Sequence, residues 1–186
     1  MVQHLTRHVV LVGMTASGKT SVAKAIAREL GVTPLDTDDI VEEIGGRSVR
    51  EIFSADGEEA FRELESRALN AALSHDEPSV IAVAAGAVTI ESNRKLLVDA
   101  AREGRADVVW LRCAVESLLP RVAAEGHRPL LDNDPADTLQ SMAATRTPLY
   151  ESVATAAVET DGQDIAHVTA RVIDLVVSSS SDRSRS

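Results

Sequence analysis

Five short segments that are apolar or extended alternate along the chain with longer segments in which apolar residues recur every three or four positions. Apolar runs of about four to eight residues are typical of strands buried on both faces, whereas the longer spacing is typical of helices with one buried face. The expected strands cover residues 8–12, 32–35, 79–84, 108–111 and 154–158. Because strands and helices alternate, we predict an α/β fold whose parallel sheet is covered by helices on both faces.

The helices between these strands have recognisable starts and stops. Ser48 and Glu51 have the spacing of a capping box, which predicts a helix that begins directly after Ser48. Gly45 ends the preceding short helix, and Pro120 is expected to kink a later helix or to open a new first turn. The expected helices cover residues 22–30, 40–44, 49–53, 56–73, 96–100, 115–119, 137–147 and 165–177. Residues 126–136 are rich in Pro, Asp and Asn, so we predict a loop there.

Residues 13–20 follow the first expected strand and have the spacing G-x-x-x-x-G-K-[ST]. In this pattern the backbone curls so that successive N–H groups converge on phosphate oxygens at a helix N-terminus. Lys19 would reach the β- and γ-phosphates, and the Thr20 hydroxyl would help to bind a bridging Mg²⁺. The alternative, a turn that binds nothing, is disfavoured because the flanking strand and helix match the context of the motif. We predict a site for ATP or a similar nucleotide with Mg²⁺, formed by Gly13, Thr15, Ala16, Ser17, Gly18, Lys19, Thr20 and Ser21.

Acidic residues follow the second expected strand, at the sheet edge where ligands bind in open α/β folds. Asp36 and Asp38 lie two positions apart, so at a strand end their side chains are expected to point in opposite directions. One would then face the metal and the other a second ligand. The alternative is that these are ordinary loop acids and that Asp39 simply caps a helix. The neighbouring phosphate loop favours the functional interpretation, because phosphoryl transfer to an alcohol needs a group that orients the hydroxyl.

Three arginines are candidates for binding anions. Arg62 is followed three residues later by Glu65, which would fix its side chain, although a solvent-exposed ion pair has the same spacing. Arg128 and Arg146 flank the predicted loop and would neutralise transferring phosphates, although arginines are common on protein surfaces. From their positions in the sequence alone, these arginines could either bind anions or be ordinary surface residues.

Composition limits the classes of function. The 186 residues are expected to form a single domain over residues 1–177, followed by a disordered Ser- and Arg-rich tail at 178–186. A formal net charge of −10 argues against nucleic-acid binding, so an anionic ligand has to be held by a local positive site. Cys113 is the only cysteine, which excludes an internal disulfide and fits a reducing cytoplasm. We also expect no membrane-spanning segment, because no apolar stretch is long enough.

The phosphate loop and five further motifs resemble the shikimate kinase family, a group of small P-loop kinases related to the nucleoside-monophosphate kinases. The resemblance extends from about residue 9 to residue 158. The motifs are Asp36-Thr37-Asp38, the segment from Ile52 through Gly57 to Arg62 and Glu65, Gly86-Ala87-Val88, Arg128-Pro129-Leu130-Leu131 and Arg146-Thr147-Pro148-Leu149-Tyr150. Their order and spacing together are more specific than any single motif.

This resemblance implies a three-layer α/β/α P-loop fold with a five-stranded parallel sheet. It places a helical substrate-binding insertion at about residues 36–65 and a lid loop at about residues 124–137. The implied reaction is transfer of the γ-phosphate of ATP to the 3-hydroxyl of shikimate, with a small ring acid as the ligand besides the nucleotide. We expect a cytoplasmic monomer.

The resemblance also implies a role for each matched residue. Asp36 would join Thr20 at the magnesium site through water, and Asp38 would orient the accepting hydroxyl or act as its base. The substrate carboxylate would be bound by Arg62, braced by Glu65, together with Arg146. Phe53 and Phe61 would form the apolar wall under the ring, and Gly86 would lie at the substrate. Arg128 would bind the phosphates and would be catalytic together with Lys19 and Asp38.

Three regions of the chain depart from the family pattern. Ala84 and Ala85 stand where the family usually has glycines, and their methyl groups would narrow the acceptor pocket. Ala16 replaces a glycine of the phosphate loop, and residues 160–164 lack the basic residues usual on the adenine side. Two alternatives therefore stay open: a related kinase for another hydroxylated ring acid or cyclitol, and a nucleotide-binding regulatory module without catalysis.

Overall fold

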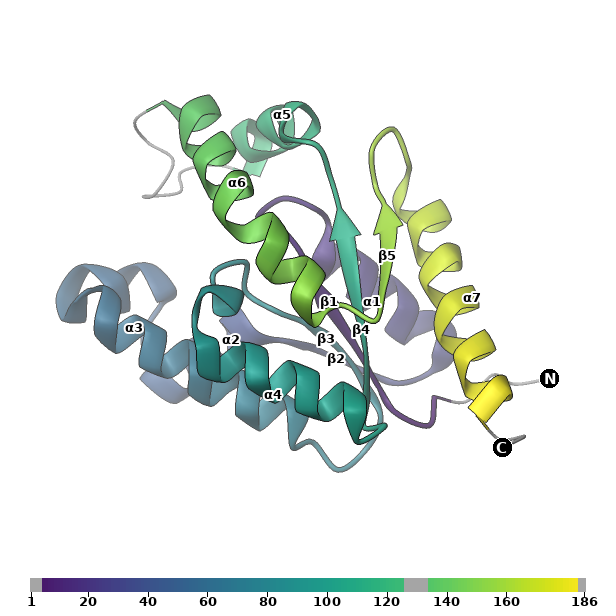
Figure 1. The fold of residues 1–186 in the computed structure, drawn as a ribbon. Coiled ribbons are helices and arrows are strands. Elements are labelled where there is room, and N and C mark those ends of the chain that lie inside the picture. Colours follow the sequence, from purple (N-terminus) through teal and green to yellow (C-terminus); the bar gives the residue numbers. More distant parts are fainter. Residues whose placement is uncertain (1–4, 126–133, 184–186) are drawn as a thin grey trace.

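A five-stranded, all-parallel sheet forms the centre of the computed structural model, which describes residues 5–125 and 134–183. The strand order is β2-β3-β1-β4-β5 (Figure 1). The strands are β1 (His8–Val12), β2 (Thr33–Asp36), β3 (Ser79–Ala82), β4 (Ala106–Arg112) and β5 (Ala156–Glu159). All five lie where the sequence predicts strands, and β1 has the predicted bounds. The three-layer α/β/α architecture is thereby confirmed.

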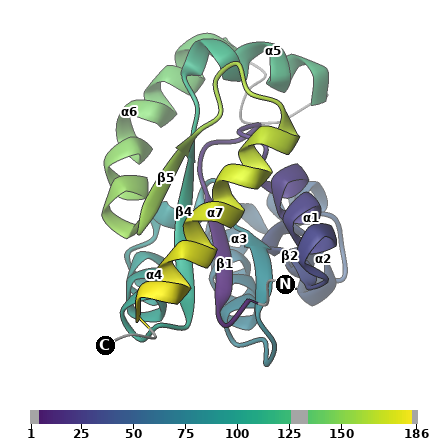
Figure 2. The same ribbon diagram turned by 90° about the vertical axis from the view of Figure 1, so that its right-hand side faces the viewer.

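Helices cover both faces of the sheet (Figures 1 and 2). They are α1 (Lys19–Leu30), α2 (Thr37–Gly45), α3 (Val49–Leu73), α4 (Glu91–Arg102), α5 (Val115–Glu125), α6 (Pro135–Val153) and α7 (Ile165–Arg183), with a short 3₁₀ helix at Ala87–Thr89. One face packs against α1 and α7, where Ile26 and Val172 meet Leu11 of β1. The other packs against α3, α4 and α6, where Leu69, Leu97 and Tyr150 are fully or almost fully buried.

A third, smaller apolar cluster lies beside the sheet, between α2 and α3. Val41 and Ile52 are fully buried there, and Phe61 is nearly so. The predicted capping box at the start of α3 is confirmed, because the Glu51 N–H donates to Ser48 Oγ at 3.3 Å and the Ser48 N–H donates to Glu51 Oε2 at 2.9 Å. Helix α2 and the first part of α3 thus pack on each other beside the sheet, and these two helices carry part of the predicted functional site.

All seven α-helices in the described part of the chain are longer than the sequence predicts, and in three of them the chain passes a predicted break or end. The two helices expected at 49–53 and 56–73 are one element, α3, with a kink at Gly57, whose φ of 82° and ψ of 178° are not helical. The helix expected to end near residue 147 continues through Pro148 to Val153, because burial of Leu139, Tyr150 and Val153 offsets the backbone hydrogen bond that proline lacks. The last helix continues to Arg183, so residues 178–183 of the expected disordered tail are helical. Adding a residue to an existing helix is easier than starting one.

Candidate active site

The phosphate loop connects β1 to α1 at the carboxyl edge of the sheet. Gly13 has φ of 151°, and a Cβ built there would lie 2.6 Å from the carbonyl oxygen of Leu111 in β4, so this position requires glycine. Gly18 has φ of 96° and precedes α1 without a side-chain cap. The first N–H groups of α1 are therefore available to an anion, and the helix dipole favours negative charge at this point.

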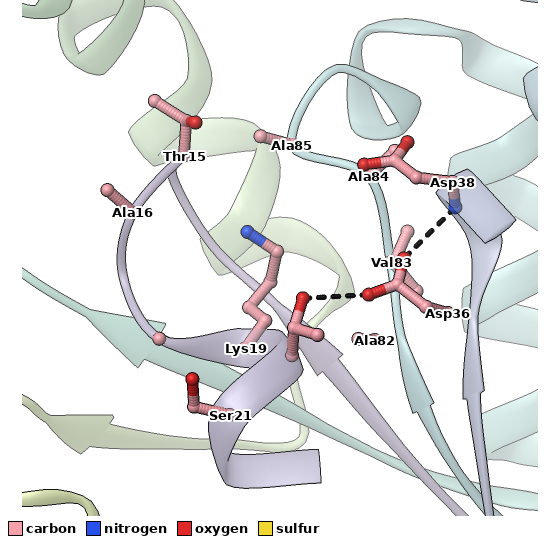
Figure 3. A pocket seen from close by; sticks show the side chains of 12 residues that line it. Thr15, Ala16, Lys19, Ser21, Asp36, Asp38, Ala82, Val83, Ala84 and Ala85 are labelled. Carbon is pink, nitrogen blue, oxygen red and sulfur yellow. Dashed lines mark hydrogen bonds between the residues drawn. The ribbon is translucent and has the colours of Figure 1, made fainter. Parts of the chain in front are cut away.

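Lys19 and Thr20 begin α1, and the Lys19 side chain points into the space enclosed by the loop (Figure 3). The Lys19 Nζ donates to the carbonyl oxygens of Gly13 at 3.0 Å and Met14 at 2.8 Å, so its charge lies within the curve of the loop. The Thr20 hydroxyl donates to Asp36 Oδ2 at 2.7 Å. The structure thus brings together the two residues that the sequence assigns to the magnesium site, although they lie in different elements.

Asp36 and Asp38 line the same pocket as Lys19 and Thr20, together with Ala84 and Ala85 (Figure 3). The expectation that the two carboxylates point in opposite directions is wrong. Asp36 ends β2, but Asp38 belongs to the first turn of α2, where strand alternation does not apply. The Asp36 carboxylate caps that helix by accepting the Asp38 N–H at 3.0 Å. Both acids therefore face the phosphate loop.

Arg62 lies on α3 and is held by two carboxylates. It forms an ion pair with Glu65 and a second one with Glu58 at 3.1 Å, and its guanidinium carbon lies 5.6 Å from the centre of the Phe61 ring. The Glu65 side chain is only 2 % exposed. A buried carboxylate with one direct arginine partner fixes that arginine, so the solvent-exposed ion pair that the sequence left open does not describe this contact.

The pKa of Glu65 reports which charges surround it. Burial raises this pKa, the neighbouring Arg62 lowers it, the charge of Asp38 raises it further, and Arg146 lowers it. Asp38 on α2, Arg62 on α3 and Arg146 on α6 therefore act on one buried carboxylate. Of these three residues, Arg62 contacts Glu65 directly, whereas Asp38 and Arg146 act on it through their charges.

The apolar wall and the glycine turn adjoin Arg62. The Phe53 and Phe61 rings meet edge to face, with centroids 5.7 Å apart. Gly86 follows β3, and a Cβ built on it would lie 2.4 Å from Arg62 Nη1. Two of the predicted substrate residues, Phe61 and Gly86, thus lie directly beside Arg62.

Two predicted features extend beyond the described residues. Arg128, assigned to catalysis and to the phosphates, lies outside them, as do residues 126–133 of the predicted lid. The flanks of that lid are helical, because α5 ends at Glu125 and α6 begins at Pro135.

Residues on the far side of the phosphate loop were missed by the sequence analysis. Arg121 of α5 donates to the carbonyl oxygens of Thr160 at 3.2 Å and Ala16 at 3.5 Å, and so connects the loop to the segment after β5. In that segment Asp161 accepts the Ala114 N–H at 3.1 Å, just before α5 begins. Hydrogen bonds lower the pKa of Asp161, and the one from the Ser117 side chain has the largest effect. No spacing rule in the sequence connects these residues.

The donor set suits a hard cation. Thr20 and Asp36 offer oxygen atoms, which Mg²⁺ prefers, and Mg²⁺ in kinases takes few protein ligands because phosphates and waters supply the others. Within residues 5–125 and 134–183 no group of three or more His, Cys, Asp or Glu side chains is placed to hold a metal ion. The same part of the chain contains no helix that is long and apolar enough to cross a membrane.

Comparison with known proteins gives consistent matches. A family model described as shikimate kinase matches residues 15–177. The shikimate kinase of Corynebacterium efficiens is 39 % identical over 166 residues, covering 89 % of this chain and 94 % of the relative. That of Moorella thermoacetica is 41 % identical over 161 residues, covering 87 % and 89 %. Among solved structures, shikimate kinase from Acinetobacter baumannii in complex with shikimate has a TM-score of 0.85 at 33 % identity and covers 93 % of this chain and 94 % of its own.

Proposed function

This chain belongs to the shikimate kinase family, and from that premise we propose that it transfers the γ-phosphoryl group of ATP to the 3-hydroxyl of shikimate. The observation that carries the proposal is the ion pair of Arg62 with the buried Glu65, whose pKa also responds to the charges of Asp38 and Arg146, beside the pocket that Lys19 and Asp38 line. A nucleotide phosphate site then adjoins a site with a carboxylate that can orient a hydroxyl and two arginines that can bind an acid.

On the nucleotide side, the backbone N–H groups of the loop and the Lys19 ammonium bind the β- and γ-phosphates. Lys19 leaves its bonds to the Gly13 and Met14 carbonyls to do so, which its long side chain allows. Thr20 and Asp36 would hold Mg²⁺, which supplies positive charge to the phosphate oxygens when it is bound. Arg128 remains a predicted partner of the same phosphates.

On the acceptor side, Asp38 accepts a hydrogen bond from the 3-hydroxyl and directs its oxygen toward the γ-phosphorus. The oxygen–phosphorus bond forms as the bond from the γ-phosphorus to the leaving oxygen of ADP breaks, and the hydroxyl proton passes to the Asp38 carboxylate. Arg62 and Arg146 bind the carboxylate of the acid, and Phe53 and Phe61 pack under the ring. Glu65 holds Arg62 in place without meeting the substrate.

A related acceptor is the second candidate. Ala84 and Ala85 line the pocket opposite the phosphate loop, and their methyl groups reduce the space available to a ring (Figure 3). A smaller or differently substituted ring acid, or a cyclitol, would suit a narrower pocket. We also propose that residues 1–177 act as one domain, monomeric and cytoplasmic, with residues 36–65 as its acceptor-binding part.

The test is ADP release by the wild-type protein with ATP, Mg²⁺ and, in turn, shikimate, quinate and myo-inositol. We expect turnover with shikimate at micromolar to low millimolar concentrations. Turnover with another acceptor and none with shikimate would show that the protein is a kinase for that acceptor. ATP binding without acceptor-dependent ADP release would favour the regulatory module.

Two variants assign the roles. Arg62→Ala should raise KM for shikimate about 10- to 100-fold, since hydrogen bonds to charged groups contribute about 1.5–3 kcal/mol. Lys19→Met should lower kcat at least about 100-fold, because it removes charge stabilisation of the transferring group. Arg67→Ala, on the exposed face of the same helix as Arg62, and Lys95→Met, on α4, are matched controls and should leave both constants unchanged. Wild-type constants for Arg62→Ala or Lys19→Met would contradict the assigned roles.

A further inference from the structure

We propose that two buried hydroxyls, those of Thr37 and Tyr150, are positioning residues that hold the turn at residues 84–86 and thereby set the acceptor site. This inference rests on the proposed function. The turn follows β3 and contributes Ala84 and Ala85 to the pocket (Figure 3). It contacts three elements, each of which carries one residue of the acceptor site.

The first contact joins the turn to α2. Thr37 lies between Asp36 and Asp38, is 1 % exposed, and accepts the N–H of Ala84 with its Oγ1 at 2.8 Å. Thr37 is the first residue of α2, and Asp38 follows it directly. The bond therefore fixes the distance between the turn and the backbone that carries the Asp38 carboxylate. Thr37 does not line the pocket with Asp36 and Asp38, so its hydroxyl acts through the backbone.

The second contact joins the turn to α6. Tyr150 is 1 % exposed and donates from its hydroxyl to the carbonyl oxygen of Ala85 at 2.8 Å. Its ring stacks on Trp110 of β4 with centroids 6.0 Å apart, so the hydroxyl has a fixed position. Arg146 lies one helical turn before Tyr150, and its side chain interacts with the same hydroxyl. Burial raises the pKa of Tyr150, so the hydroxyl stays protonated and keeps donating at physiological pH.

The third contact joins the turn to α3. At Gly86 the backbone comes so close to Arg62 that an added Cβ would lie 2.4 Å from Nη1. A shift of the turn therefore either displaces the guanidinium of Arg62 or changes the room available to it. The helices that carry Asp38, Arg62 and Arg146 thus all contact the turn at residues 84–86. The hydroxyls of Thr37 and Tyr150 attach this turn to α2 and α6.

Removing the Thr37 hydroxyl takes a partner from the buried Ala84 N–H, and removing the Tyr150 hydroxyl takes one from the half-buried Ala85 carbonyl, so in both cases the turn is expected to shift. The nucleotide site should change less, because its loop joins β1 to α1 and the Tyr150 hydroxyl reaches that loop through a weak contact with Met14 Sδ at 4.0 Å. We therefore expect Tyr150→Phe and Thr37→Val each to raise KM for shikimate about 10-fold, with KM for ATP within about twofold of the wild-type value. Thr37→Ser keeps the hydroxyl and should restore most of the affinity. Both bonds hold the same turn. In the double variant, KM for shikimate should therefore rise by less than the product of the two single increases.

Thr155→Val is the matched control for lost stability. The Thr155 hydroxyl bonds to the N–H and the carbonyl oxygen of Val108 at 3.1 Å and 3.0 Å, away from the pocket. Its removal should lower Tm to a similar extent and leave both KM values unchanged. Thr169→Val removes a buried hydroxyl of α7 that has no hydrogen-bond partner among the described residues, so it should not lower Tm and should leave the kinetics unchanged.

The closing experiment measures kcat, both KM values and Tm for wild type and these variants in one ADP-release assay, with the Kd for shikimate from calorimetry. A rise in KM and Kd for shikimate that exceeds the effect of Thr155→Val at equal Tm supports the inference. Parallel changes for ATP and shikimate, or a loss of Tm with unchanged KM, would overturn it and leave the proposed function intact. Absence of shikimate turnover and binding by the wild type would instead contradict the proposed function itself.

Discussion

Ala16 has a left-handed backbone conformation, with φ of 56°, in the middle of the phosphate loop. For a residue with a Cβ this conformation costs about 1–2 kcal/mol, whereas glycine adopts it without strain. The loop is nevertheless fixed in this shape, because Ala16 lies between the close approach of Gly13 to β4 and the start of α1.

Replacing Ala16 by glycine should therefore stabilise the protein. After subtracting the entropy that glycine loses on folding, we expect the free energy of unfolding to rise by about 0.5–1 kcal/mol. Urea denaturation measures this change. Ala60→Gly, inside helix α3, is the control and should instead lose up to about 1 kcal/mol. A loss of stability for Ala16→Gly would show that the conformation is not strained.

Gly86→Ala tests the contact between the turn and Arg62. The added Cβ meets Arg62 Nη1, so the guanidinium has to shift against its ion pair with the buried Glu65, and we expect the free energy of unfolding to fall by about 1–3 kcal/mol. Because Arg62 then leaves its place beside the acceptor, KM for shikimate should rise about 10-fold or more. Unchanged KM, with the protein folded, would mean that Arg62 adapts without consequence for binding.

At the scale of elements, the kink in α3 sets the direction of the segment that carries Arg62. Gly57 has φ of 82° and ψ of 178°, a combination that is essentially confined to glycine. The part of α3 before the kink packs on α2 through Ile52, and the part after it packs on the sheet through Leu69.

Gly57→Ala should reduce the free energy of unfolding by about 1–3 kcal/mol, because the kink then carries a strained residue. KM for shikimate should rise as well, since the Arg62 segment is redirected, whereas KM for ATP should not. Denaturant titration and initial rates measure both effects. A stable variant with a wild-type KM would show that the kink is not required.

The pairing of β1 with β3 makes stability depend on pH. His8 at the start of β1 is buried, and its Nδ1 accepts the N–H of Ser79 at 3.1 Å. Burial lowers the pKa of His8, and His75 and Arg105 lower it further. The resulting contribution to stability is fully present above the unfolded pKa of about 6.5 and is lost as pH falls through the lower folded value.

We therefore expect the Tm of the wild type to fall between pH 7.5 and 5 more steeply than that of His8→Gln. His167→Gln removes an exposed histidine of α7 and should keep the wild-type slope. Identical slopes for His8→Gln and the wild type would exclude His8 as the titrating group.

Sequence patterns predicted elements well where a local feature defines them. Apolar or extended segments locate all five strands, and the side chains of Ser48 and Glu51 locate the start of α3. Patterns failed where tertiary packing decides: α6 passes Pro148 because its buried residues hold it, and Asp38 faces the pocket because the chain turns from strand to helix at Thr37.

At the scale of the whole molecule, the parallel sheet brings the carboxyl ends of β1, β2 and β3 to one edge. A chain with a formal net charge of −10 holds a local group of cations there, with Lys19, Arg62 and Arg146 on three different helices. The motifs name the residues that we propose for the site, whereas their mutual contacts follow from topology. The bond from Tyr150 to Ala85 spans 65 positions, and no local pattern indicates it.

The most direct test of the proposed reaction is the identity of its product. Wild-type protein incubated with ATP, Mg²⁺ and shikimate is followed by ³¹P and ¹H NMR, which show the hydroxyl that carries the new phosphate. We predict one phosphomonoester, at the 3-hydroxyl, formed in step with ADP. A phosphate on another hydroxyl, or ADP formed with inorganic phosphate and no ester, would contradict the roles assigned to Asp38, Arg62 and Arg146.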